Sequence, residues 1–157
     1  MAKDRPATRR EPARAPVPRL QDTVRLSADG VAKVLGDLEA RLLQTMWALG
    51  QPASAREVHA SIVKRHPVSP LTTTTVLNKL VTKKILSRRK IDGLFHFEPR
   101  LSEAAFHAVV SRRVMEGILS FGPKALAASF VDVLAERDPE QLEELGRLVR
   151  LRLREQG

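Results

Sequence analysis

The order of local signals between residues 37 and 99 constrains the fold of this chain more than any other feature. Apolar residues at helical spacing begin after Asp37, which can cap a helix, and this pattern ends at Gly50. Ser54 and Glu57 form the Ser-x-x-Glu pattern of a capping box, which begins a second helix. A third helix signal and a hairpin signal come next, so the sequence predicts a mainly α domain with one small β element.

The third helix is expected over residues 69–84, with Ser69 as its cap and Pro70 at the first helical position. The four residues Thr72–Thr75 are β-branched and would also suit a strand, because such residues are mediocre helix formers. The apolar residues of the segment 76–81 recur at helical rather than alternating spacing, however. This spacing favours the helix.

The two faces of this third helix differ in their chemistry. Counted from Thr72 at about 100° per residue, the apolar residues form a stripe centred at about 110°. The opposite face, centred at about 290°, carries Thr75, Asn78, Lys79 and Thr82 and no acidic residue. Hydroxyls, an amide and an ammonium suit phosphate oxygens, base edges and thymine methyls, whereas a solvated face more usually mixes Glu with Lys. We therefore expect this face to contact DNA, and a plain solvated surface is the alternative.

A hairpin is expected directly after the third helix. Asp92-Gly93 stands between two short runs of alternating character, and this dipeptide is a strong hairpin turn signal. Three short helices followed by such a hairpin is the order of a winged helix-turn-helix domain. In that domain the third helix enters the major groove and the hairpin, or wing, lies along the DNA backbone. Arg88, Arg89 and Lys90 of the wing would then grip phosphates.

Composition divides the chain into three parts, within a total of 27 basic and 18 acidic residues and a net charge of +9. Residues 1–35, rich in Pro, Arg and Ala, predict a disordered basic arm, either an inert solubilising tail or a segment that touches DNA. A short helix over 27–34 that packs on the neighbouring domain is also possible. Residues 36–99 form the expected winged-helix DNA-binding domain. Residues 100–157 contain only helix signals and have balanced charge, as an assembly element would.

The helices expected in residues 100–157 carry an apolar stripe, which is sharpest in the last helix. This stripe packs either on the chain's own domain or on the matching stripe of a second copy. We favour a homodimer, because helix-turn-helix modules usually contact two half-sites through a two-fold axis. The residues expected to hold the dimer are Leu126, Phe130, Val133, Leu142, Leu145, Val149 and Leu153.

What the chain lacks excludes several classes of protein. It has no Cys, so a disulfide scaffold, a thiolate metal site and a cysteine nucleophile are ruled out. No apolar run approaches the length of a bilayer span and no secretory signal is visible, so we expect a cytoplasmic protein. The four His match no metal motif, and no catalytic constellation appears, so we expect no cofactor and no enzyme. A helical adaptor that binds proteins or RNA through a basic face remains the alternative to a DNA-binding regulator.

Five segments resemble the BlaI/MecI/CopY (penicillinase repressor) family of bacterial winged-helix transcriptional repressors. They are Gly-Asp-Leu-Glu to Met-Trp at 36–47, Ser-Ala-Arg-Glu-Val at 54–58, Ser-Pro-Leu-Thr-Thr-Thr-Thr-Val-Leu-Asn-Lys-Leu-Val-Thr-Lys-Lys-Ile-Leu at 69–86, the wing at 89–99, and Phe-Gly-Pro-Lys-Ala-Leu at 121–126. The resemblance implies a homodimeric repressor that binds a two-fold symmetric operator through the helix at 69–84. It also implies that the last of these segments begins the dimerisation helices.

Two branches of that family sense their signals in ways that this chain cannot. The copper-responsive branch uses a C-terminal cysteine cluster, and this chain has no Cys. The penicillin-responsive branch is cleaved at an Asn-Phe bond in the dimerisation region, and the only Asn here is Asn78. The residues expected to contact DNA in such a repressor are Ser54, Arg56, Ser69, Thr72, Thr74, Thr75, Asn78, Lys79, Thr82, Lys83, Arg88, Arg89 and Lys90.

Overall fold

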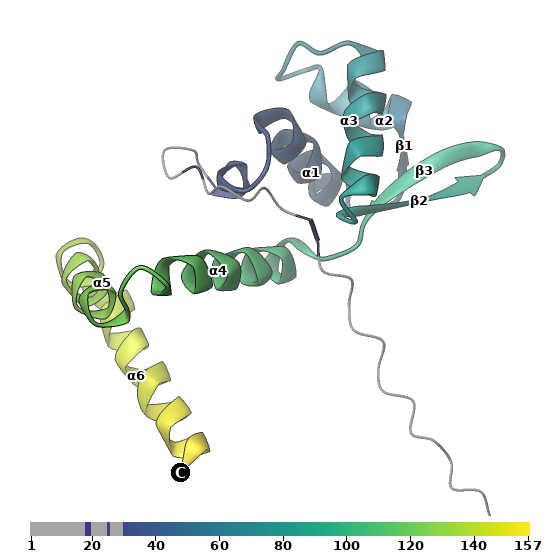
Figure 1. Ribbon diagram of the computed structural model, residues 1–157. Coiled ribbons are helices and arrows are strands. Elements are labelled where there is room, and N and C mark those ends of the chain that lie inside the picture. Colours follow the sequence, from purple (N-terminus) through teal and green to yellow (C-terminus); the bar gives the residue numbers. More distant parts are fainter. Residues whose placement is uncertain (1–17, 20–24, 26–29) are drawn as a thin grey trace, which may run out of the picture. The chain divides into compact units, whose positions relative to one another are not determined.

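The computed structural model describes residues 18, 19, 25 and 30–157, which form two compact units that divide after residue 107 (Figure 1). The first unit has the order of a winged helix, as the sequence predicts. The elements that lie wholly in it are the 3₁₀ helix η1 (Gly30–Lys33), α1 (Asp37–Leu49), β1 (Ala53–Ser54), α2 (Ala55–Ile62), α3 (Pro70–Thr82), β2 (Leu86–Ile91) and β3 (Leu94–Pro99). Helix α4 (Glu103–Leu119) comes next and continues into the second unit.

Local capping explains where the helices of the first unit begin. The Ser54 hydroxyl accepts from the Glu57 N–H at 3.3 Å, and the Ser54 N–H donates to the Glu57 carboxylate at 2.7 Å, which confirms the capping box of α2. The Ser69 hydroxyl caps α3 by accepting from the Thr72 N–H at 3.1 Å, and Pro70 is the first helical residue, as predicted.

The start of α1 differs from the prediction that Asp37 caps it. Gly36 is the N-cap, with extended backbone, and its N–H donates to the Glu39 carboxylate at 2.9 Å. Asp37 is already helical, and its carboxylate pairs with Arg25 at 2.7 Å. Glu39 therefore supplies one half of a capping box, while Gly36 has no side chain to accept from the N–H groups of the first turn.

The sheet has three antiparallel strands in the order β1-β3-β2, rather than the two that the sequence predicts. The expected hairpin is present, with Ile91 opposite Leu94 across the turn. Asp92 and Gly93 both have positive φ, of 50° and 81°, which is the backbone of the type I′ turn that Asp-Gly favours. Strand β1 pairs with β3 over two residues, which is too short for an alternating pattern to reveal it.

The core of the first unit lies between the three helices and the root of the wing. Its fully buried side chains come from every layer: Leu42, Leu43, Met46, Val58, Leu77, Leu80, Leu86 and Phe106. The ring of Trp47 packs on Phe106 with centroids 5.5 Å apart, and its indole N–H donates to the Leu101 carbonyl at 3.0 Å. These contacts attach the start of α4 to α1.

The folded unit begins before residue 36, the expected boundary of the arm. Residues 30–35 contain η1 and bury Val31, Val34 and Leu35, because these three apolar side chains cover one side of the core. The Arg25 guanidinium donates to the carbonyl of Leu35 at 3.1 Å and pairs with Asp37. The rest of the predicted arm, at 1–17, 20–24 and 26–29, lies outside the described residues.

The second unit is built from the remainder of α4 and from α5 (Pro123–Arg137) and α6 (Pro139–Gln156). Asp138 caps α6 by accepting from the Gln141 N–H at 3.2 Å, and Pro139 is its first residue, as the sequence predicts. Helices α5 and α6 pack against each other, yet neither contains a buried residue. In the part of the chain that is described, no helix combines the length and hydropathy that crossing a membrane requires.

Candidate nucleic-acid interface

One side of α3 faces the core and the other faces solvent. Thr73, Leu77 and Leu80 are buried, while Val76 and Val81 are half-buried, so the core side lies where the helical arithmetic places it. The outward residues form a surface that we call the α3 face. Its members are Thr72, Thr75, Asn78, Lys79 and Thr82, of which Asn78 is half-buried and the others are exposed.

The threonine hydroxyls of α3 are already engaged within the helix. Thr74, Thr75 and Thr82 donate to the carbonyls four residues earlier, at 3.1, 2.9 and 3.2 Å respectively. Such bonds let β-branched threonines sit in a helix despite their low propensity. Each hydroxyl has used its only hydrogen, so it can offer a ligand an acceptor oxygen and a methyl group, but no donor.

Asn78 joins α3 to the wing. Its side-chain N–H₂ donates to the Thr74 carbonyl at 3.0 Å, and its side-chain oxygen accepts from the Arg88 guanidinium at 2.6 Å. The same guanidinium lies over the Phe95 ring, 4.6 Å from its centroid. Arg88 is thereby held in one place between α3 and β3, with its remaining N–H groups free of these contacts.

The cations of the wing lie on both of its faces. Arg88 and Lys90 alternate with Arg89 along β2, and side chains two residues apart share a face of a strand. The Lys90 ammonium shares the Phe95 ring with Arg88, at 5.4 Å from the centroid, while Arg89 is paired opposite His96. All three are exposed, and the hairpin extends past α3 (Figure 1).

Two lysines near the end of α3 face a buried carboxylate of α1. Glu39, whose side chain is 5% exposed, pairs with Lys83 at 2.7 Å, and Lys79 lies 3.6 Å away. Burial raises the pKa of Glu39, but the hydrogen bonds from Lys83 and the Gly36 N–H, with the charges of both lysines, outweigh it and hold the pKa below 4.5. Lys83 is therefore largely committed to the fold, whereas Lys79 stays mostly exposed.

The other predicted DNA contacts lie at the starts of helices. The hydroxyls of Ser54 and Ser69 cap α2 and α3, and Arg56 is exposed in the first turn of α2. Helix N-termini present free N–H groups and partial positive charge, which suit phosphate oxygens. These three positions stay predictions, as do the contacts of the α3 face and the wing.

Leu71 is the residue of this surface that the sequence prediction missed. It is the second residue of α3 and is 77% exposed. The same arithmetic that defined the two faces puts it at about 260°, inside the outward stripe. Its position on the helix is the signal for it, because its apolar side chain does not distinguish it from the core residues of α3.

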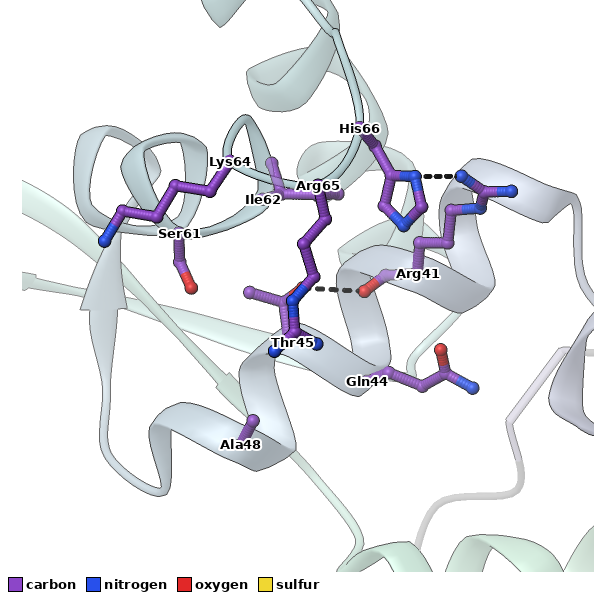
Figure 2. A pocket seen from close by; sticks show the side chains of 9 residues that line it. All are labelled: Arg41, Gln44, Thr45, Ala48, Ser61, Ile62, Lys64, Arg65 and His66. Carbon is purple, nitrogen blue, oxygen red and sulfur yellow. Dashed lines mark hydrogen bonds between the residues drawn. The ribbon is translucent and has the colours of Figure 1, made fainter.

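A basic pocket of about 350 Å³ lies between α1 and the end of α2 (Figure 2). Its basic lining residues are Arg41, Lys64, Arg65 and His66, and none of its lining residues is acidic. Arg41 and His66 point toward one another and are in contact.

The four histidines are dispersed. The His59 ring lies 2.9 Å from the Val68 carbonyl, His66 contacts Arg41, His96 is on the wing, and His107 packs edge-on against Trp47. Within residues 18, 19, 25 and 30–157, no group of three or more His, Asp or Glu is arranged to hold a metal ion.

The predicted dimer residues of the second unit are only partly covered by their own chain. Leu126, Leu142 and Leu145 are half-buried. The others are exposed: Phe130 at 43%, Val133 at 48%, Val149 at 48% and Leu153 at 63%.

Comparisons with known proteins bear on both units. A family model described as penicillinase repressor matches residues 35–150. Two curated proteins named transcriptional regulator BlaI, from two strains of Mycobacterium tuberculosis, are each 29% identical over 65 residues, which is 41% of this chain and 47% of each relative. The chain therefore aligns with about half the length of these relatives. A solved structure of a Lactococcus lactis ZitR mutant has a TM-score of 0.37 and 13% identity, covering 85% of this chain and 83% of that one.

Proposed function

Because the chain belongs to the penicillinase repressor family, we propose that this transcriptional regulator is a repressor that binds operator DNA as a homodimer. The observation that carries the proposal is the continuous surface formed by the α3 face and the wing. This surface has no acidic member on α3, and the Asn78–Arg88 hydrogen bond connects its two parts. Such a surface suits a DNA duplex, which presents phosphate oxygens along its backbone and base edges in its grooves.

In the proposed complex, α3 lies in the major groove and the wing runs along the adjacent backbone. The Arg88 guanidinium, oriented by Asn78 and Phe95, donates to a phosphate at the edge of the groove. Arg89 and Lys90 reach phosphates from the two faces of the wing. A dimer that covers the operator in this way blocks access of RNA polymerase, which is the simplest mechanism of repression.

The homodimer is supported by the apolar side chains that α5 and α6 leave exposed. These helices bury no residue in the single chain, and they expose Phe130, Val131, Val133, Leu148 and Val149, each at least 43%. Helices of this length are only marginally stable alone and gain their stability by packing an apolar face. A second copy of the same helices would cover these side chains and place two α3 helices on one duplex.

The test begins with a genome-wide map of bound fragments, and anisotropy titrations then compare the best fragment with a shuffled duplex of equal length. A repressor of this kind should prefer its operator by a factor of about 10³ or more in moderate salt. Arg88→Ala should weaken binding to both duplexes, and Lys124→Ala, an exposed cation of α5, is the matched control. Equal affinity for both duplexes and for RNA would instead indicate a basic adaptor, and the proposal would fail.

A further inference from the structure

Leu71 stands out on α3 because an apolar side chain is 77% exposed at the N-terminal end of an otherwise polar surface. Single exposed leucines are common and need no explanation by themselves. The position of this one is what matters. Leu71, Thr75, Asn78 and Thr82 lie between about 240° and 300° around the helix axis, within one narrow stripe.

The polar groups around Leu71 already form hydrogen bonds within the protein. The Thr75 hydroxyl donates to the Leu71 carbonyl at 2.9 Å, and the Asn78 amide is shared between the Thr74 carbonyl and Arg88. The Thr72 hydroxyl accepts a hydrogen bond from the Ser69 hydroxyl at 2.8 Å. The first two turns of α3 therefore offer a ligand the Leu71 side chain, threonine methyl groups and acceptor oxygens, but few donors.

Only one apolar group is available in the major groove of DNA, the 5-methyl group of thymine. We propose that Leu71, together with the methyl groups of Thr72 and Thr75, contacts a thymine 5-methyl group in each half-site and makes this regulator selective for thymine at that position. This inference rests on the proposed function, since it assigns a specificity contact to the same α3 face. Polar side chains cannot take this role, because a methyl group neither donates nor accepts a hydrogen bond.

The test removes the methyl group from the DNA while leaving base pairing intact. Each thymine of the operator is replaced in turn by uracil, and affinity is measured for the wild type and for Leu71→Ala. One thymine in each half-site should be sensitive, with a loss of about fourfold when its methyl is removed, the effect of exposing one buried methyl-sized group. In Leu71→Ala the same replacement should cause little further loss, because the contact is already missing.

Two further variants separate a specificity role from a structural one. Leu71→Met keeps an apolar side chain of similar size and should retain sensitivity to the thymine methyl. Val63→Ala removes an exposed apolar side chain at the end of α2, 41% exposed and outside both the proposed DNA surface and the proposed dimer, and should leave the uracil profile unchanged. Melting curves of all variants report whether the fold is intact.

The outcomes of the scan distinguish failure of this inference from failure of the proposed function. If the wild type prefers an operator but no thymine is sensitive to loss of its methyl, Leu71 does not contact one. The same conclusion holds if Leu71→Ala loses affinity and keeps the full uracil penalty. If no duplex is preferred over a shuffled one, the proposed function itself is wrong, and this inference falls with it.

Discussion

The buried ion pair between α1 and α3 should be a main support of the winged-helix unit, and Glu39→Gln tests it. The substitution keeps the size of the side chain and an oxygen that can accept from the Gly36 N–H. It removes the charge that faces Lys83 at 2.7 Å and Lys79 at 3.6 Å. Lys83, whose side chain is 20% exposed, is then left without its carboxylate.

The expected loss depends on how deeply each partner is buried. Breaking a fully buried ion pair costs about 3–5 kcal/mol, whereas a single hydrogen bond to a charged group contributes about 1.5–3 kcal/mol. Glu39 is almost fully buried, but the Lys83 ammonium can turn toward water. We therefore expect a loss of about 2 kcal/mol, which for a unit of this size lowers the melting temperature by roughly 8–16 °C.

The effect should also depend on pH. The pKa of Glu39 lies below 4.5 in the folded protein, so its contribution is fully present above the unfolded pKa and is lost as pH falls through the folded pKa. Gln does not titrate in this range. The difference in melting temperature between wild type and Glu39→Gln should therefore be constant from about pH 7 to pH 5 and should shrink at lower pH.

Thermal melts monitored by circular dichroism at several pH values measure both quantities. Glu98→Gln, at an exposed carboxylate of β3 in the same unit, is the control and should melt close to the wild type. The reasoning is refuted if Glu39→Gln melts within about 2 °C of the wild type at neutral pH, which is below the shift expected for even 1 kcal/mol. A difference that persists unchanged in acid would refute the assignment to the carboxylate charge.

Three other predictions concern DNA binding and assembly. Arg89→Ala should flatten the log–log dependence of affinity on salt by about 1 for each protomer, on operator and random DNA alike; an unchanged slope with altered sequence preference would mean that Arg89 touches a base. Asn78→Ala and Arg88→Ala should each weaken operator binding, and the double variant should lose less than their sum, because one hydrogen bond joins them; strict additivity would show that they act separately. Leu145→Glu with Val149→Glu should give monomers whose first unit still folds, because unpaired carboxylates cannot be buried in an apolar seam; sedimentation of the double variant as a dimer would place the interface elsewhere.

Much of the fold could be predicted because its signals are local. The capping box of Ser54 and Glu57, the Ser69-Pro70 start of α3 and the Asp92-Gly93 turn each depend on residues within a few positions, and the structure confirms all three. The winged-helix class could be inferred from their order.

The contacts that the sequence did not reveal join residues of different segments. Glu39 meets Lys83 across 44 residues, and neither its burial nor its partner has a local signature. Arg25 fixes the segment before α1 by hydrogen bonds to carbonyls, which any sequence could supply. The Asn78–Arg88 bond joins a helix to a strand, and no pattern within either element indicates it.

The exposed apolar side chains of α5 and α6 should make the stability of this protein depend on its concentration in the cell. If these helices are completed by a second copy, the folding stability of the second unit rises with protomer concentration. A fall in concentration would then lower the dimer population and leave more chains with open helices for proteases to attack. In the proposed repressor, operator occupancy should consequently drop more steeply than protein abundance, so that gradual loss of the protein would release its target gene abruptly.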